Sequence, residues 1–348
     1  MLNEKGKRMC KHLVLYAPTR AHTQRVFRPE TYERFLAGFE VVANQSDRNY
    51  TTAELEDFIP GYEAIVTGWG VAPLSERFFE RADRLRMIAH SAGTVKPFFP
   101  GDLWEKQVVA RGICVFSANH AIAYNVAEAT IGYMIMVPRR WFEHALAIRT
   151  TADWGAPGVP RNGQYLLGST VGIVSASKVG REVIRMLQPF DCTVLLYDPF
   201  VSEWEAGRLG VRLCSLDELF AKSDIVSVHA PHIPATVGLI GRRELKRMKD
   251  GATLINTSRG KVIDREALYE ELRTGRILAA LDVTDPEPLA ADDPIRKLPN
   301  VIVTPHISGA GSYGYLMIGE LTLRALEDFF AGRPVIGQVP YESYEILA

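Results

Sequence analysis

Three things are scarce in this sequence of 348 residues: an excess of charge of one sign, a long hydrophobic run, and cysteine. Forty lysines and arginines stand against 41 aspartates and glutamates, a net charge of −1. Such a balance provides no broad field to attract nucleic acid or an anionic membrane surface. The most apolar stretch, Ile131 to Val137, is far shorter than the roughly 20 residues of a membrane-spanning helix. Nucleic-acid and membrane partners are therefore not expected.

Cysteine is too sparse and too scattered for a disulfide framework or a metal cluster. The four residues, Cys10, Cys114, Cys192 and Cys214, form no C-x-x-C pair. Cys114 and Cys192 lie in or beside β-like runs, where a cysteine usually acts as a small buried hydrophobe. The N-terminus lacks the extended apolar core and the cleavage site of a secretory signal. We therefore expect a reduced, cytoplasmic protein with no metal site.

The sequence contains a regular alternation of short apolar, β-branched runs with longer helical patterns. The candidate strands are His12–Ala17, Glu40–Ala43, Ala64–Thr67, Met87–Ser91 and Ile113–Phe116, followed by Thr170–Val174, Thr193–Tyr197, Ile225–His229, Thr253–Asn256, Leu278–Asp282 and Val301–Thr304. Strands separated by helices predict right-handed crossovers and parallel sheets. Together with the chain length, this pattern predicts an α/β protein with two open, doubly wound parallel-sheet domains.

A candidate nucleotide-binding loop follows the strand Thr170–Val174. The segment Ser175-Ala-Ser-Lys-Val-Gly180 stands where a dinucleotide fold places G-x-G-x-x-G, but only its last glycine, Gly180, is present. A Cβ at Ser177 would crowd a phosphate, although its hydroxyl can donate a hydrogen bond to one. The helix N-terminus still provides free N–H groups to an anion. An ordinary strand-to-helix turn is the competing interpretation of this loop.

Asp198 favours the nucleotide interpretation. It closes the next strand, 18 residues after Gly180, where a carboxylate can accept hydrogen bonds from an adenosine ribose. Its negative charge would repel a 2′-phosphate, so NAD is expected rather than NADP.

Three further residues with useful chemistry follow later predicted strands. They are Arg259 in Asn256-Thr-Ser-Arg-Gly260, Glu287 in Asp282-Val-Thr-Asp-Pro-Glu-Pro288, and His306 in Thr304-Pro-His306. Ligands of open α/β sheets bind outside the carboxyl ends of the strands, so these residues are expected to converge. An arginine can clamp a carboxylate with two hydrogen bonds, a histidine can exchange a proton with a hydroxyl, and a glutamate can orient that histidine.

From about His90 to His306 the sequence resembles the D-isomer-specific 2-hydroxyacid dehydrogenase family. The matching positions include His229-Ala-Pro231, Thr236, Gly251-Ala-Thr-Leu-Ile-Asn256, Arg259-Gly260, Ala280-Leu-Asp-Val283, Glu287-Pro288 and Thr304-Pro-His-Ile307. The resemblance implies an NAD-dependent enzyme that interconverts a D-2-hydroxy acid and its 2-keto acid. Arg259 would bind the substrate, His306 would be the acid/base, and Glu287 would pair with His306.

The resemblance also implies the cofactor and substrate contacts. The cofactor-binding positions would be Ser177, Lys178, Val179, Asp198, Ala230, Pro231, Thr236, Thr257 and Asp282. On the substrate side the family often has G-x-G-x-D where this chain has Ser91-Ala-Gly-Thr-Val-Lys96, with Val95 in place of the aspartate. Backbone N–H groups around Ala92, Gly93 and Thr94 are still expected to hold a carboxylate.

The domain organisation follows from the same resemblance. A Rossmann nucleotide domain, residues 119–308, would be inserted into a flavodoxin-like substrate domain made of residues 1–118 and 309–348, and the protein would be a homodimer. Since two glycines of the nucleotide loop are serines, a second interpretation stays open. The chain would then be a weak or inactive family member that acts as a dinucleotide-responsive regulatory protein.

Overall fold

The computed structural model describes residues 11–346, and Cys10 lies outside this range. These residues form a five-stranded and a seven-stranded sheet, and every strand pairing within both sheets is parallel. The chain divides into two compact units. The first unit contains residues up to 122 and from 311 onward, and the second contains residues 123–310.

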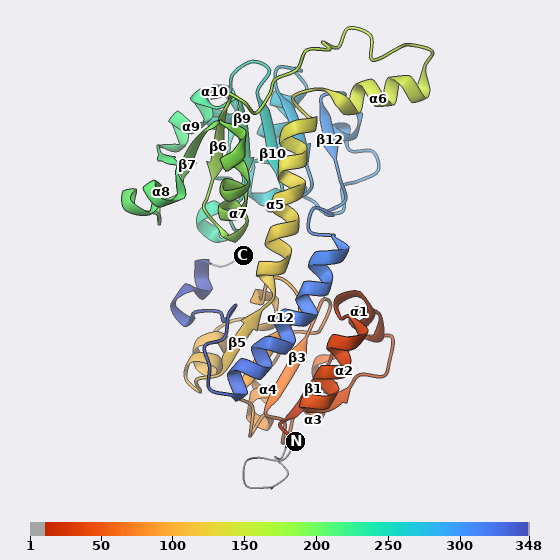
Figure 1. The fold of residues 1–348 in the computed structure, drawn as a ribbon, viewed down its shortest axis with the longest axis vertical. Helices are drawn as coiled ribbons and strands as arrows, with labels where there is room; N and C mark the ends of the chain where they lie inside the picture. Colours follow the sequence, from red (N-terminus) through yellow and green to blue (C-terminus); the bar gives the residue numbers. More distant parts are fainter. Residues whose placement is uncertain (1–10, 347–348) are drawn as a thin grey trace. The chain divides into compact units, whose positions relative to one another are not determined.

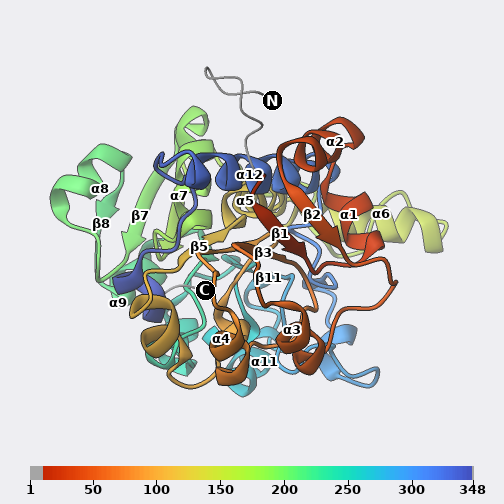
Figure 2. The ribbon, with the colours of Figure 1, turned by 90° about the horizontal axis from the view of Figure 1, so that it is seen from below.

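The first unit has the strand order β2-β1-β3-β4-β5. Its strands are β1 (Leu13–Tyr16), β2 (Glu40–Ala43), β3 (Ala64–Thr67), β4 (Met87–His90) and β5 (Cys114–Ser117). Its helices are α1 (Arg20–Val26), α2 (Pro29–Gly38), α3 (Thr52–Phe58), α4 (Glu76–Arg81) and α12 (Ser312–Phe330). Helices α1, α2 and α12 cover one face of the sheet and α3 and α4 cover the other (Figure 2). The sheet is therefore buried on both sides.

The second unit has the strand order β12-β11-β10-β9-β6-β7-β8. Its strands are β6 (Thr170–Val174), β7 (Thr193–Tyr197), β8 (Arg212–Leu213), β9 (Ile225–Val228), β10 (Thr253–Asn256), β11 (Leu278–Leu281) and β12 (Val301–Val303). Its helices are α6 (Trp141–Thr150), α7 (Lys178–Leu187), α8 (Glu203–Leu209), α9 (Leu216–Lys222), α10 (Arg242–Arg247) and α11 (Arg265–Leu272), and most of α5 (Asn119–Met136) also belongs to it. Helices α5, α7 and α8 pack on one face of this sheet (Figure 1). Helices α9, α10 and α11 pack on the other face.

The predicted fold class is confirmed. Each of the eleven predicted strands is present, with ends that differ by at most one residue from those expected. The strand that the sequence did not suggest is β8, which is two residues long and lies at the sheet edge. Short edge strands carry little hydrophobic pattern, because one of their sides is open.

Local sequence signals account for several of the helix starts. Thr51 and Glu54 form a capping box at the start of α3, and Ser215 accepts a hydrogen bond from the Glu218 N–H at the start of α9. Cys114 is buried in β5, as its apolar neighbours predict. Within residues 11–346, no helix is long and apolar enough to cross a membrane, and no cluster of histidine, cysteine or acidic residues is arranged to hold a metal ion.

Two buried histidines make the first unit sensitive to acid. His22 bonds to Ser91 Oγ at 2.8 Å through Nε2, and His90 bonds to Thr67 Oγ1 at 3.0 Å through Nδ1. Burial lowers the pKa of His22 to about 4, helped by Arg25, and lowers that of His90 to about 3, helped by His22. Both side chains are therefore neutral in the folded protein at pH 7.

We predict that the free energy of unfolding falls as the pH drops below about 6.5. The unfolded chain takes up protons near that pH, whereas the folded chain excludes them until the pH nears the lowered pKa values. The slope should be about 1 kcal/mol per pH unit for each histidine. Urea unfolding at a series of pH values between about 7.5 and 5 measures how the free energy of unfolding changes with pH. His90→Gln should flatten the slope and His232→Gln, at an exposed position, should not. An unchanged slope in His90→Gln would contradict the prediction.

Candidate active site

The predicted cofactor and catalytic residues of the second unit all follow the carboxyl ends of its strands. Because every strand of this sheet runs parallel, these ends lie along one edge. The segments that follow β6, β7, β9, β10, β11 and β12 are, in turn, 175–180, 198–200, 229–236, 257–260, 282–287 and 304–308. In an open α/β sheet this edge is the place for a ligand.

The loop after β6 has the backbone of a nucleotide-binding turn despite its serines. Ser175 has φ of 78°, a left-handed conformation that favours glycine. Ser177 is the N-cap of α7, and its hydroxyl oxygen accepts a hydrogen bond from the Gly180 N–H at 3.3 Å, so its own O–H proton remains available to a ligand. A Cβ on Gly180 would lie 2.1 Å from the Ser175 carbonyl oxygen. The retained glycine is therefore needed for close packing of helix on strand.

Asp198 is held against this loop. Its Oδ2 accepts hydrogen bonds from the Ala176 N–H at 2.8 Å and the Ser175 hydroxyl at 3.1 Å, and its Oδ1 accepts one from the Phe200 N–H at 2.9 Å. The carboxylate is thus at the end of β7, next to the phosphate-binding turn. Loop, helix N-terminus and carboxylate together fit the diphosphate and ribose of a dinucleotide.

The other predicted cofactor residues border the same edge, and several also stabilise the local turns. Lys178 and Val179 begin α7, and burial lowers the pKa of Lys178. Thr236 donates to the Pro231 carbonyl at 2.5 Å, next to the buried Ala230. The Thr257 hydroxyl lies 3.0 Å from that of Thr130 on α5.

A tight turn after β10 presents Arg259. Asn256, which is buried, donates to the Arg259 carbonyl at 3.0 Å and accepts from the Ser258 N–H at 3.0 Å. Arg259 Nη1 in turn donates to the Ser258 carbonyl at 2.7 Å. Burial lowers the pKa of Arg259 and the charge of Glu287 opposes this, although a guanidinium remains protonated in any protein. Asn256 was not among the site residues predicted from the sequence, although it ends the strand before the turn.

Gly260 allows the backbone of the Arg259 turn to lie in close contact with the segment that carries Glu287. A Cβ on Gly260 would lie 2.1 Å from the Thr284 carbonyl oxygen. Only glycine permits this approach of two backbones. The position therefore helps to place a cation and a carboxylate side by side, which the motif alone did not reveal.

His306 and Glu287 form the closest contact between predicted catalytic residues. His306 Nδ1 lies 2.5 Å from Glu287 Oε1, and the two side chains are 45% and 41% exposed. With Nδ1 bound to the carboxylate, Nε2 is the nitrogen left to exchange a proton with a ligand. The structure thus brings His306, Glu287 and Arg259 together at the ends of three neighbouring strands.

Asp282 anchors the loop of His306. Its Oδ1 accepts from the Thr304 hydroxyl at 2.6 Å and the Ile307 N–H at 2.9 Å, and its Oδ2 accepts from the Ser308 N–H at 2.9 Å. The Tyr133 hydroxyl on α5 lies 2.8 Å from Thr304 Oγ1 and extends this network. His306 itself has φ of 53°, so the network holds a strained backbone.

The predicted substrate loop belongs to the first unit, where it follows β4. Ala92 is buried, and the Gly93 carbonyl accepts a hydrogen bond from Ser117 Oγ at 2.6 Å. Thr94 Oγ1 accepts from the Lys96 N–H at 3.4 Å. These bonds fix the loop within its own unit.

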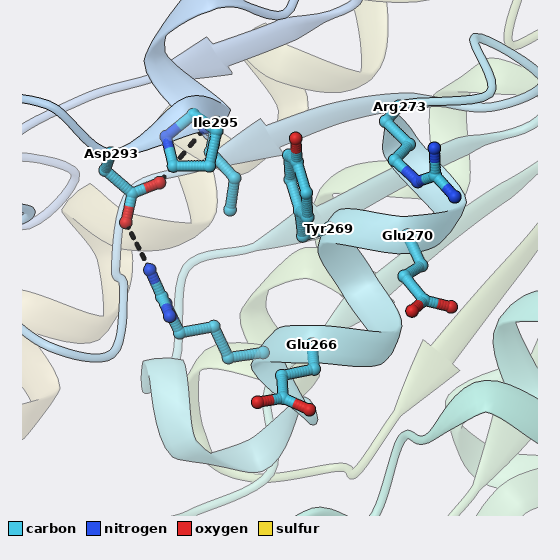
Figure 3. Close-up of a pocket in the computed structure, with 8 residues that line it drawn as sticks. Glu266, Tyr269, Glu270, Arg273, Asp293 and Ile295 are labelled. Carbon is cyan, nitrogen blue, oxygen red and sulfur yellow. Dashed lines mark hydrogen bonds and ion pairs between the residues drawn. The ribbon is translucent and has the colours of Figure 1, made fainter.

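A separate pocket of the second unit lies between α11 and the segment that leads into β12 (Figure 3). Arg265 bonds to Asp293 at 2.5 Å there, and Glu270 pairs with Arg242. None of its lining residues is a predicted site residue. Since it lies away from the strand ends that carry the predicted residues, it is not the candidate site.

Comparison with known proteins points to one family. The family described as “D-isomer specific 2-hydroxyacid dehydrogenase, NAD binding domain” matches residues 131–308. NAD is thus the cofactor of the second unit. The chain is 33% identical over 293 residues to a D-3-phosphoglycerate dehydrogenase of Archaeoglobus fulgidus, a match that covers 84% of this chain and 54% of that protein. It is 34% identical over 263 residues to a glyoxylate reductase of Korarchaeum cryptofilum, which covers 75% of this chain and 77% of that protein.

A solved structure agrees over nearly the whole chain. The TT0316 protein from Thermus thermophilus matches with a TM-score of 0.75 and 30% identity, and covers 94% of this chain and 100% of the other. By contrast, the chain spans only about half the length of the D-3-phosphoglycerate dehydrogenases that it matches, 54% and 52% in two archaeal examples.

Proposed function

Because this chain belongs to the D-isomer specific 2-hydroxyacid dehydrogenase family, we propose that it interconverts a D-2-hydroxy acid and its 2-keto acid with NAD. The observation that carries the proposal is the contact of 2.5 Å between His306 and Glu287, with Arg259 beside them. A protein that only binds a dinucleotide has no need of an oriented histidine and a cation at the same strand ends.

The three side chains have distinct proposed roles in the reductive direction. Arg259 binds the carboxylate and carbonyl oxygen of the keto acid through its planar fork of N–H donors. His306 gives a proton from Nε2 to the oxygen that becomes the hydroxyl. Glu287 keeps Nδ1 occupied, so the ring stays oriented and its positive charge is stabilised.

We assign cofactor binding to residues 119–308 and substrate binding to residues 1–118 with 309–348. The turn of Ser177, the start of α7 and Asp198 would hold the diphosphate and ribose, and Asp282 would contact the carboxamide. Bound NADH would supply the hydride for C2 of the keto acid. The amides of Ala92, Gly93 and Thr94 would bind the substrate carboxylate, and exclusion of water would favour the transfer.

A titration with NADH and NADPH, followed by a screen of 2-keto acids, tests the function. We expect saturable NADH binding, weaker NADPH binding, and turnover of at least one 2-keto acid. Saturable binding without turnover of any acid would favour the regulatory alternative. No binding of either dinucleotide would contradict both.

We further propose that the protein is a homodimer that buries the α6 patch. This patch consists of exposed apolar side chains on α6 and the segment after it: Trp141, Phe142, Leu146, Ile148, Trp154, Tyr165 and Leu167. The Arg139 guanidinium lies over the rings of Trp141 and Tyr165. Figure 1 shows α6 standing off from the sheet of its unit. Several large apolar side chains exposed on one helix and the segment after it are typical of protein interfaces, and a second copy of the chain is the partner always present.

The double variant Phe142→Glu/Leu146→Glu should convert the dimer to a monomer. In the dimer, the two glutamates of each subunit would be buried in the interface without partners, and this cost would outweigh the free energy gained from the apolar contacts there. Light scattering after size exclusion should give about 78 kDa, twice the 38.8 kDa of one chain, for the wild type and half of that for the variant. Trp204→Glu, at a residue 72% exposed on α8, serves as the control and should remain dimeric. A monomeric wild type would refute the proposal.

A further inference from the structure

Asp198 has little acceptor capacity left for a ribose. A carboxylate has about four lone-pair sites. Three donors already use this one, the Ser175 hydroxyl and the N–H groups of Ala176 and Phe200. The residue that the proposed function assigns to the ribose can therefore accept about one further hydrogen bond, where a ribose offers two adjacent hydroxyls.

Ser175 is the donor that a glycine at this position would not supply. Its backbone has φ of 78°, so it adopts the glycine conformation while it carries a side chain. The hydroxyl at 3.1 Å is the longest of the three hydrogen bonds to Asp198. The two backbone N–H groups at 2.8 and 2.9 Å bind one oxygen each, so they orient the carboxylate without help from the serine.

We propose that Ser175 limits the dinucleotide affinity of this chain, because its hydroxyl competes with the adenosine ribose for Asp198. The inference rests on the proposed function and names the residue that sets the affinity of its cofactor site. Ser175 acts on the carboxylate itself, and the positive φ is a separate, structural cost. The ribose is then bound through one strong hydrogen bond in the wild type and through two once the hydroxyl is removed.

Two variants separate the hydroxyl from the backbone strain. Ser175→Gly removes both, whereas Ser175→Ala removes the hydroxyl and keeps a side chain at positive φ. Both should lower the Kd for NADH by about threefold to tenfold, as one added hydrogen bond of ordinary net strength would. The melting temperature should be higher for Ser175→Gly than for Ser175→Ala, since only glycine relieves the strain. Ser215→Ala, which removes the N-cap of α9, is the control and should leave the Kd unchanged.

NADH fluorescence gives the Kd, and calorimetric titration with ADP, 2′-deoxy-ADP and 3′-deoxy-ADP reports the ribose contacts. The wild type should lose affinity with one of the two deoxy compounds, and both variants should lose it with each. Equal or weaker NADH binding in both variants would overturn the inference. So would tightening in Ser175→Gly alone, because strain would then be the cause. If neither the wild type nor the variants bind NADH, the proposed function fails as well, so the two failures are distinguishable.

Discussion

His306→Asn is expected to lower kcat by about a thousandfold and to change the Kd for NADH by less than about twofold. The side chain is 45% exposed and bonds only to Glu287 among the hydrogen bonds described for it, so its removal should leave the fold intact. Asparagine is the replacement of choice because His306 has φ of 53°, and asparagine tolerates that conformation better than alanine does. Steady-state rates with the best 2-keto acid and an NADH titration measure the two effects.

Glu287→Gln is the companion variant, because it keeps the shape and removes the charge. The ring of His306 would lose its oriented, charged partner at 2.5 Å, so kcat should fall by about tenfold to a hundredfold while KM changes little. His12→Asn, at the amino end of β1 and outside the segments that follow the carboxyl ends of the strands, is the control and should be fully active. A His306→Asn enzyme with more than a tenth of the wild-type kcat would remove His306 from the acid/base role.

Much of the architecture could be predicted because parallel strands are buried on both faces. Their runs of β-branched and apolar residues are visible without any knowledge of the fold, and the ends of β6, β7 and β10 agree to the residue. The same logic explains why the catalytic candidates were found. Each lies in the loop that follows such a run, and the chemistry of arginine, glutamate and histidine can be inferred from the residue type alone.

The interactions that hold those residues in place were beyond the sequence. Asp282 was expected to contact the cofactor, and its carboxylate also binds the loop of His306 through three hydrogen bonds. Tyr133 reaches that network from a helix some 170 residues away in sequence. The spacing of residues along the chain does not predict such contacts, because they depend on how the helix packs on the sheet. The proposed competition between the Ser175 hydroxyl and a ribose for Asp198 could not be predicted for the same reason. A serine in place of a glycine does not reveal which group its hydroxyl will contact.

Arg259→Lys should lower kcat/KM for 2-keto acids by about a thousandfold, most of it through KM. Lysine keeps the charge but not the planar fork that binds a carboxylate and a carbonyl oxygen together, so charge alone should not rescue activity. The lysine would also lack the guanidinium N–H that reaches the Ser258 carbonyl at 2.7 Å, a bond that fixes the side chain in its turn.

The fold should survive Arg259→Lys, because the turn is held by Asn256 through backbone groups that the substitution does not touch. NADH affinity should therefore stay within about twofold of the wild type. Arg273→Lys, at the exposed C-cap of α11, is the matched control and should leave all constants unchanged. If Arg259→Lys kept kcat/KM within about threefold of the wild type, a point charge at this position would be enough to bind the substrate. The proposal that Arg259 binds the substrate with two hydrogen bonds would then be wrong. The acid/base role of His306 would not be affected, because it is tested separately by His306→Asn.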